Sequence, residues 1–283
     1  MHIVVCIKQV PDSAQIRVHP VTNTIMRQGV PTIINPYDMF AIEAALRLRD
    51  QHGGKVTVLT MGPPMAEESL RRALSFGVDR AVLLTDRTFA GSDTLATSYA
   101  LSQAIIKIGQ EFGTPDIVFT GKQTIDGDTA QVGPGIAKRL NLNQLTYVAS
   151  IKELNLSYRT IAVERRAEGG VQVLTTKLPC LITMLEGTNE IRRGSIDVAL
   201  NAARQDIVTW SAAAAGIKEM TKCGLKGSPT VVKRVFAPPP RTEKAFLIDL
   251  DGHTPDALAA GTIEEIFKRL PFLEKDLIHL AQN

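Results

Sequence analysis

Short runs of apolar residues, several of them rich in β-branched side chains, alternate with longer mixed stretches over the first 150 residues. None of these runs alternates strictly between apolar and polar positions, which is typical of strands covered on both faces of a sheet. The runs predict strands at residues 3–7, 56–61, 81–84, 117–120 and 145–149.

Between these runs, apolar residues recur at helical spacing and predict three amphipathic helices. Strands that alternate with helices indicate a parallel sheet with helices on both faces. We therefore expect an α/β fold with a doubly wound, mostly parallel, Rossmann-like sheet. The helical stripes consist of Ala41, Ala44, Ala45 and Leu48, of Ala66, Leu70 and Ala73, and of Leu101, Ala104, Ile105 and Ile108.

The pattern changes after residue 149. Residues 158–166 alternate like a half-exposed strand, and a turn at 167–170 leads into 171–176, so a β-hairpin excursion is predicted. Residues 181–185 predict one more buried strand, and 192–210 a partly helical segment.

The last part of the chain predicts an extended C-terminal arm followed by a helix. Residues 224–241 look extended, and Pro238, Pro239 and Pro240 exclude a helix and lack amide donors for a sheet interior. Residues 262–280 predict an amphipathic helix. We expect an α/β domain over 1–225 and an arm and helix over 226–283.

Composition and charge exclude several classes of protein. The chain is 44% hydrophobic with a net charge of +3, so neither disorder nor a nucleic-acid-binding surface is expected. Cys6, Cys180 and Cys223 are far apart and form no C-x-x-C pair, which predicts reduced thiols and a cytoplasmic protein. No apolar run reaches the roughly 18 residues of a membrane span, and the N-terminus lacks a basic segment, so no signal peptide is expected.

The loop from Gly121 to Pro134, which follows a predicted strand, is the strongest candidate for chemistry. Ligands of open α/β sheets bind at the carboxyl ends of the strands. Asp128 and Gln131 have the spacing of a capping box, which predicts a helix that starts there. N–H groups at such a helix start bind anions, and Asp126 or Asp128 can accept hydrogen bonds from ribose hydroxyls.

Other interpretations of this loop stay open. It can be an ordinary capped loop, or its two aspartates can act as an acid/base pair or bind Mg²⁺. No His or Cys lies nearby in the sequence, and the common phosphate-binding motifs are absent. We expect no catalytic side chain and no metal site. An ATP-hydrolysing domain would need a glycine-rich loop at residues 8–12, which are not glycine-rich.

Residues 35–38 form a second candidate site before the first predicted helix. Pro36 favours an extended Asn35, and Asp38 either caps the helix or contacts a ligand. The five histidines are scattered away from the predicted strand ends. The residues alone thus indicate a nucleotide-binding α/β domain whose chemistry comes from a cofactor.

Several stretches, at 4–12, 35–38, 61–64 and above all 121–134, resemble the electron-transfer flavoprotein β subunit family. The resemblance covers essentially the whole chain. The stretches 12–20 and 178–186 resemble the nitrogen-fixation (Fix) branch of that family. The resemblance implies an adenine-nucleotide-binding fold, with the nucleotide or FAD in 1–225 and with 226–283 on a partner subunit.

The resemblance also implies a heterodimer with a FixB-like α subunit. Bifurcating members of the family hold FAD at the β-subunit site, whereas simple members hold AMP, and residues 126–134 resemble the bifurcating form. The positions that match the family's cofactor site are Cys6, Asn35, Pro36, Tyr37, Asp38, Met61, Gly121, Lys122, Gln123, Thr124, Ile125, Asp126, Gly127, Asp128, Thr129, Ala130, Gln131 and Val132.

The bifurcating form implies NADH as electron donor. Electrons would go towards quinone through FixC/FixX-like partners, namely a quinone-oxidoreductase flavoprotein and a ferredoxin-like subunit, and towards ferredoxin or flavodoxin for nitrogen fixation. The chain would reach the inner membrane only through that complex. Residues 8–12 are the candidates for tuning the flavin.

The family's partner-recognition loop has a counterpart that departs from the usual pattern. The family carries a proline and a tyrosine in this loop, and this chain has neither. The corresponding residues are Asn189, Glu190, Arg192, Arg193 and, as the apolar anchor, Ile196. The departure implies a different set of partners, although the stretch can also simply cap a helix at Ser195.

Overall fold

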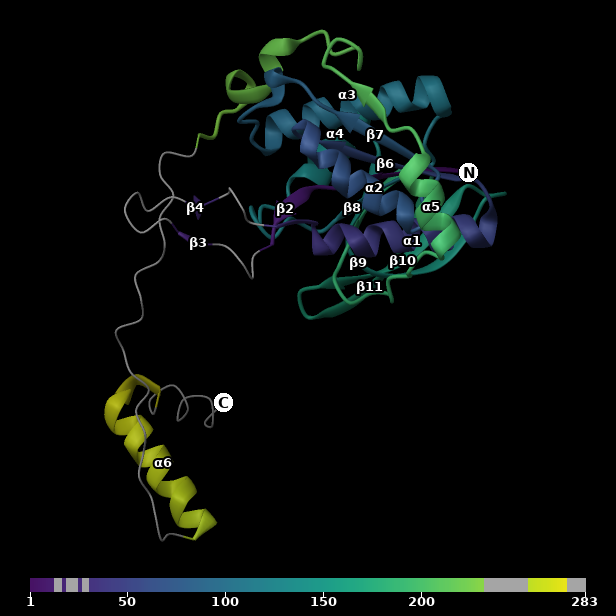
Figure 1. Ribbon diagram of the computed structural model, residues 1–283. Coiled ribbons are helices and arrows are strands. Elements are labelled where there is room, and N and C mark those ends of the chain that lie inside the picture. The colour runs from purple at the N-terminus through teal and green to yellow at the C-terminus, as the bar shows by residue number, and fades with distance from the viewer. Residues whose placement is uncertain (13–16, 19–24, 27–30, 232–253, 274–283) are drawn as a thin grey trace. The chain divides into compact units, whose positions relative to one another are not determined.

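The computed structural model describes residues 1–12, 17–18, 25–26, 31–231 and 254–273 (Figure 1). The chain divides into two compact units, Met1–Phe236 and Ala237–Asn283. The expected boundary after residue 225 and the packing of 226–283 on a partner stay predictions. The predicted arm at Pro238, Pro239 and Pro240 lies outside the described residues.

The described residues of the first unit form a nine-stranded sheet with the order β11-β10-β9-β12-β8-β1-β6-β7-β13. Pairing is parallel from β9 through β13, and antiparallel where β10 joins β9 and β11. The expected α/β fold with a mostly parallel sheet is thus confirmed. The strands are β1 (His2–Cys6), β6 (Lys55–Met61), β7 (Arg80–Leu84), β8 (Ile117–Gly121), β9 (Asn143–Asn155), β10 (Thr160–Ala167), β11 (Gly170–Lys177), β12 (Cys180–Met184) and β13 (Val208–Trp210).

Helices pack on both faces of this sheet (Figure 1). One core cluster includes residues of α1 (Pro36–His52), α2 (Glu67–Ser75) and α5 (Ile196–Arg204), and the other includes residues of α3 (Thr94–Phe112) and α4 (Val132–Leu140). In β1, Ile3 and Val5 belong to the first cluster and Val4 to the second. Both faces of the strand are buried, which explains its continuous apolar run and confirms the doubly wound arrangement.

The predicted hairpin is present as β10 and β11, which pair from Thr160 with Lys177 to Ala167 with Gly170. A small antiparallel pair, β2 (Gln9–Pro11) with β5 (Thr32–Ile34), lies before α1, and β3 (Arg17–Val18) pairs with β4 (Ile25–Met26). Short 3₁₀ helices occur at η2 (Pro64–Ala66) and η3 (Arg87–Phe89).

The segment 192–210 is helical in part, as predicted: it contains α5 and ends in β13, which is too short to show periodicity and is stabilised by pairing with β7. Two other expectations for the second half of the chain need correction. Residues predicted as extended from 224 onward begin with 3₁₀ helix η5 (Gly224–Gly227), just after η4 (Met220–Lys222). The last helix, α6 (Pro255–Arg269), begins earlier than predicted because the Thr254 hydroxyl accepts the N–H of Ala257.

Candidate functional site

The carboxyl ends of β1 and β8 and the start of α1 meet at one edge of the sheet. β1 has β6 on one side and β8 on the other, so the strand order reverses between β1 and β8. Such a reversal is where open α/β sheets bind ligands. The N–H of Asn35 donates to the carbonyl of Lys8 over 2.9 Å, which holds α1 against the end of β1.

Asp38 is a buried carboxylate that joins the two strand ends. One oxygen accepts the N–H of Lys8 (2.8 Å), and the other accepts the N–H of Gly121 (3.0 Å). Burial raises the pKa of Asp38 to about 7, and these two donors oppose the rise. The alternative that Asp38 caps the helix is wrong, because α1 begins at Pro36 with Asn35 as its N-cap residue.

Gly121 is required by the close approach of α1 rather than by a turn. A Cβ atom at this position would lie 2.5 Å from Asp38 Oδ1 and 2.6 Å from Tyr37 Cβ. A Cβ atom does not make nonbonded contacts this short, so any side chain here would push the start of α1 away from β8. Gly121 therefore allows the hydrogen bond between its own N–H and Asp38.

Asn35 and Lys8 fix the first part of the loop that follows β8. Asn35 is buried; its Nδ2 donates to the carbonyl of Gln123 (2.8 Å), and its Oδ1 accepts the N–H of Ile125 (3.2 Å). Lys8 Nζ lies 2.8 Å from each carboxylate oxygen of Asp126. Partial burial acts to raise the pKa of Asp126, but the Lys8 ammonium holds it below its usual value.

The rest of this loop differs from the predicted capping box. Asp128 and Ala130 have left-handed φ angles of 51° and 54°, whereas an N-cap residue is typically extended. The Asp128 carboxylate accepts Gln123 Nε2 (2.7 Å), and Gln131 Oε1 accepts the Thr94 hydroxyl (2.7 Å). The predicted start at Asp128 is therefore wrong: α4 begins at Val132, and no side chain caps it.

Lys122 lies close to two tyrosine rings. Its Nζ is 5.6 Å from the ring centroid of Tyr37 and 5.5 Å from that of Tyr147. Tyr147 has a φ of 58°, which is rare for a bulky residue, and its N–H donates to the Thr183 hydroxyl (3.1 Å). Sequence reasoning missed Tyr147, because only the irregular register of β9 brings it to this site.

Several other predicted cofactor residues lie in or beside the hydrophobic core. Cys6, at the end of β1, belongs to the core cluster on the α3 and α4 face of the sheet, and Met61 and Val132 pack against that core cluster. Burial raises the pKa of the Cys6 thiol, so it stays a neutral thiol. Gly127 and Thr129 lie in the exposed part of the loop.

The predicted partner loop lies along α1. Asn189 Nδ2 donates to the carbonyl of Phe40 (3.0 Å), and Arg192 contacts Glu43. The Ser195 hydroxyl accepts the N–H of Val198 and so caps α5. Ile196 is 79% exposed. The structure therefore places the predicted anchor on the surface beside a fixed loop.

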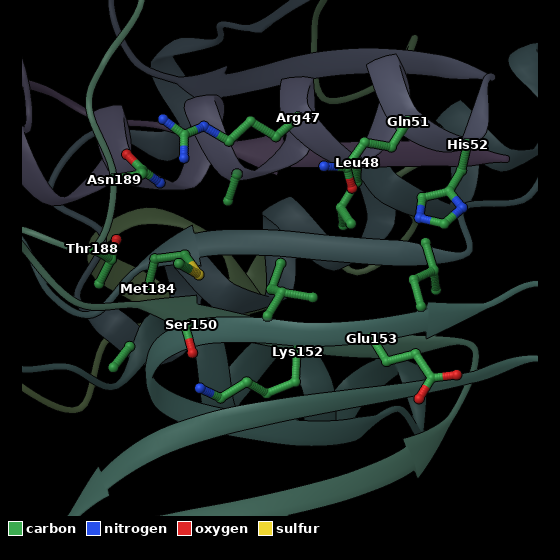
Figure 2. Close-up of a pocket in the computed structure, with 14 residues that line it drawn as sticks. Arg47, Leu48, Gln51, His52, Ser150, Lys152, Glu153, Met184, Thr188 and Asn189 are labelled. Atoms are coloured by element: carbon green, nitrogen blue, oxygen red, sulfur yellow. The ribbon is translucent and has the colours of Figure 1, made fainter.

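A cavity of about 440 Å³ lies between α1 and β9 (Figure 2). Figure 2 shows Arg47, Gln51 and His52 on its helix side and Ser150, Lys152 and Glu153 on its strand side. Of the predicted site residues, only Asn189 lines it. Ser150 Oγ and Asn189 Oδ1 are buried without a hydrogen-bond partner in the described part of the chain.

The described residues contain no group of three His, Cys, Asp or Glu side chains placed to hold a metal ion. No helix within the described ranges is long and apolar enough to cross a membrane.

Comparison with a family model and with individual proteins gives consistent results. The sequence of residues 22–215 matches the family model described as the electron transfer flavoprotein domain. The protein named FixA of Azorhizobium caulinodans is 74% identical over the full length of both chains, and that of Azotobacter vinelandii is 63% identical over 99% of this chain and all of its own. The electron transfer flavoprotein subunit beta of Clostridium acetobutylicum is 46% identical over 83% of this chain and 87% of its own.

Proposed function

The chain belongs to the electron transfer flavoprotein β subunit family, and on that premise we propose that it is the β subunit of a heterodimeric electron-transfer flavoprotein that serves nitrogen fixation. The observation that carries the cofactor part of this proposal is the start of α4. No side chain caps it, and it follows a loop that Asn35, Lys8 and Asp38 fix at the reversal of strand order.

The residues present fit the adenosine diphosphate part of FAD. Backbone N–H groups at a helix start, preceded by left-handed residues such as Asp128 and Ala130, stabilise phosphate oxygens. Asp126 is held ionised by Lys8, so its oxygens are acceptors of the kind that ribose hydroxyls need. We assign the cofactor to Cys6, residues 35–38, Met61 and residues 121–132.

Bound flavin would supply the electron-transfer chemistry, and the chain would position it and set the charge around it. Lys8 is neutralised by Asp126. Lys122 forms no ion pair among the described residues and faces tyrosine rings instead. We therefore assign to Lys122 the positive charge that acts on a bound cofactor.

The electron route that we propose is flavin-based bifurcation. NADH is the donor, and the acceptors are quinone on one branch and ferredoxin or flavodoxin on the other. The partners are a FixB-like α subunit and FixC/FixX-like proteins, and the chain acts in the cytoplasm, with membrane contact only through them. The support is the full-length similarity to proteins named FixA.

We also propose that the C-terminal unit packs on the α subunit. Within α6 and the residues just after it, Ile263, Ile266, Leu270 and Phe272 are exposed. Ile263, Ile266 and Leu270 recur at helical spacing, so they form one apolar face. An apolar helix face of this kind is stabilised when a partner covers it.

The decisive test is the cofactor content of this chain purified with its α subunit. Two FAD molecules per heterodimer and no AMP would support a redox flavin on this chain. One FAD with one AMP would show that this chain binds a structural nucleotide and no redox cofactor, and would contradict bifurcation.

A second test addresses the loop itself. Asp128→Ala removes the carboxylate that Gln123 contacts and places alanine at a left-handed φ, so we expect the complex to lose its nucleotide more readily during dialysis. Asp128→Asn is the matched control, since asparagine tolerates that φ. Unchanged retention in Asp128→Ala would contradict the assignment of this loop.

A further inference from the structure

Glu43 is an acidic residue in the middle of α1 that is only 3% exposed. Its Oε2 accepts the N–H (3.2 Å) and Nε (2.8 Å) of Arg192, and its Oε1 accepts Arg192 Nη2 (3.2 Å) and Arg47 Nε (2.8 Å). Burial acts to raise the pKa of Glu43, but Arg192 and Arg47 hold it below its usual value. Charge-assisted, two-pronged contacts of this kind have a defined geometry.

Arg192 also connects the loop to a longer series of ion pairs. Its Nη1 lies 2.6 Å from Asp50 Oδ2, Asp50 pairs with Arg49 (2.8 Å), and Arg49 pairs with Asp79 (2.9 Å). This series spans the second half of α1 and the turn before β7. Arg192 is therefore held by two residues on the same face of α1, Glu43 and Asp50, which lie about two turns apart.

The backbone on either side of Arg192 is held as well. Arg47 Nη2 donates to the carbonyl of Glu190 (3.0 Å), and a Cβ atom on Gly194 would overlap the carbonyl oxygen of Ser75. Figure 2 shows Arg47 and Asn189 together at one end of the cavity beside α1. The whole stretch from 189 to 194 therefore lies close against α1 and α2.

This fixed stretch leads directly into α5. Ala202 on α5 is buried, and its carbonyl accepts Arg71 Nη1 (2.9 Å), so the end of the helix is attached to α2. Ile196 and Leu200, four positions apart and hence on one face, are 79% and 51% exposed. The start of α5, where Ile196 lies, depends on the loop for its position.

We propose that Glu43 and Arg192 are positioning residues for the docking of an electron-accepting flavoprotein. Their buried ion pair fixes the start of α5 and so sets the direction in which Ile196 and Leu200 face that partner. This inference rests on the proposed function, to which it adds the interpretation of 189–196 as the loop that contacts the partner.

Arg192→Gln and Arg166→Gln form a matched pair for the test. Each removes one positive charge, but Arg166 lies on β10, is exposed, makes no ion pair in the described part of the chain and is not part of the 189–196 loop. In the complex with the α subunit, Arg192→Gln should speed hydrogen exchange of the 189–196 amides and raise KM for the quinone-oxidoreductase flavoprotein, each by about tenfold, with kcat unchanged. Arg166→Gln should leave both values within about twofold.

Two further variants keep the outcomes distinct. Arg192→Lys retains the positive charge but cannot make the two parallel hydrogen bonds of a guanidinium group. A KM between those of the unmodified protein and Arg192→Gln would support the proposal. If Arg192→Gln does not fold, the comparison is made with Arg192→Lys instead. Equal KM in Arg192→Gln and Arg166→Gln would overturn the positioning role. An unchanged KM in Ile196→Asp would overturn the interpretation of 189–196 as the partner loop. A raised KM in Ile196→Asp together with an unchanged KM in Arg192→Gln would overturn only the positioning role.

Discussion

Gly121 and Asp38 determine the geometry of the strand-end site at the scale of single residues. Asp38 uses both carboxylate oxygens to hold two backbone N–H groups from different strands, and Gly121 leaves the room for it. Neither role could be read from local sequence, because Lys8, Asp38 and Gly121 lie far apart along the chain. The sequence did mark all three as neighbours of predicted strand ends or helix starts.

Gly121→Ala should destabilise the protein and weaken nucleotide retention together. The new Cβ would lie within 2.6 Å of Asp38 and Tyr37, so α1 must shift or the hydrogen bond to Asp38 must lengthen. We expect a loss of about 1–3 kcal/mol in the free energy of unfolding, from overpacking. Urea unfolding measures it. Gly127→Ala is the control, since its Cβ would lie 3.4 Å from its nearest neighbour and no positive φ is involved.

Asp38→Asn should show a pH-dependent loss of stability. An amide oxygen cannot replace both carboxylate oxygens, so one buried N–H loses its acceptor at a cost of about 1–3 kcal/mol. The folded pKa of about 7 lies above the ordinary value of about 4. Folding therefore favours the protonated form of Asp38. The unmodified protein has its full stability from this group below about pH 4 and loses that contribution as the pH rises through about 7.

The difference in unfolding free energy between Asp38→Asn and the unmodified protein should accordingly narrow as the pH rises from 5 to 8. Urea unfolding at several pH values provides the measurement. A difference that stays constant over this range would show that Asp38 does not titrate there.

At the scale of elements, tertiary contacts decide which residues cap the helices. The sequence placed a capping box at Asp128 and Gln131, but Gln123 and Thr94 engage these two side chains, and α4 starts without a cap. Ser195, by contrast, caps α5 as one interpretation of the sequence had it. Local spacing predicts a cap only where no distant polar group competes for the same side chain.

Asp93 offers a test of capping, since it caps α3 and also joins a later segment. Its oxygens accept the N–H groups of Leu95 and Ala96 and of Thr230. Asp93→Ala should cost about 1 kcal/mol, and Asp93→Asn should cost less because its oxygen can still cap. Partial burial acts to raise the pKa of Asp93, but these N–H groups hold it below its usual value.

The contribution of Asp93 should therefore be present above about pH 4 and be lost as the pH falls through the lowered folded pKa. Thermal unfolding of both variants between pH 3 and pH 7 gives the measurement. Equal stability of Asp93→Ala and the unmodified protein at neutral pH would contradict the capping role.

At the scale of the whole molecule, both core clusters lie within the unit Met1–Phe236. We therefore expect a chain ended at residue 236 to unfold cooperatively with a Tm within about 3 °C of the full chain. We also expect it to bind the α subunit more weakly, because it lacks the exposed apolar face of α6. Calorimetry and co-purification measure the two effects. Full retention of the α subunit would contradict the role assigned to residues 237–283.

The sequence by itself determined the fold class, most strands and helices and the general place of the site, because burial on both sheet faces and helical periodicity are local patterns. Tertiary structure alone decided which polar groups meet. Asp38 bridges two strand ends, Tyr147 reaches Lys122 through an irregular strand, and Glu43 holds Arg192 from 149 positions away. Hydrogen bonds and ion pairs depend on distances of a few ångströms between residues far apart along the chain, and no local pattern specifies these distances.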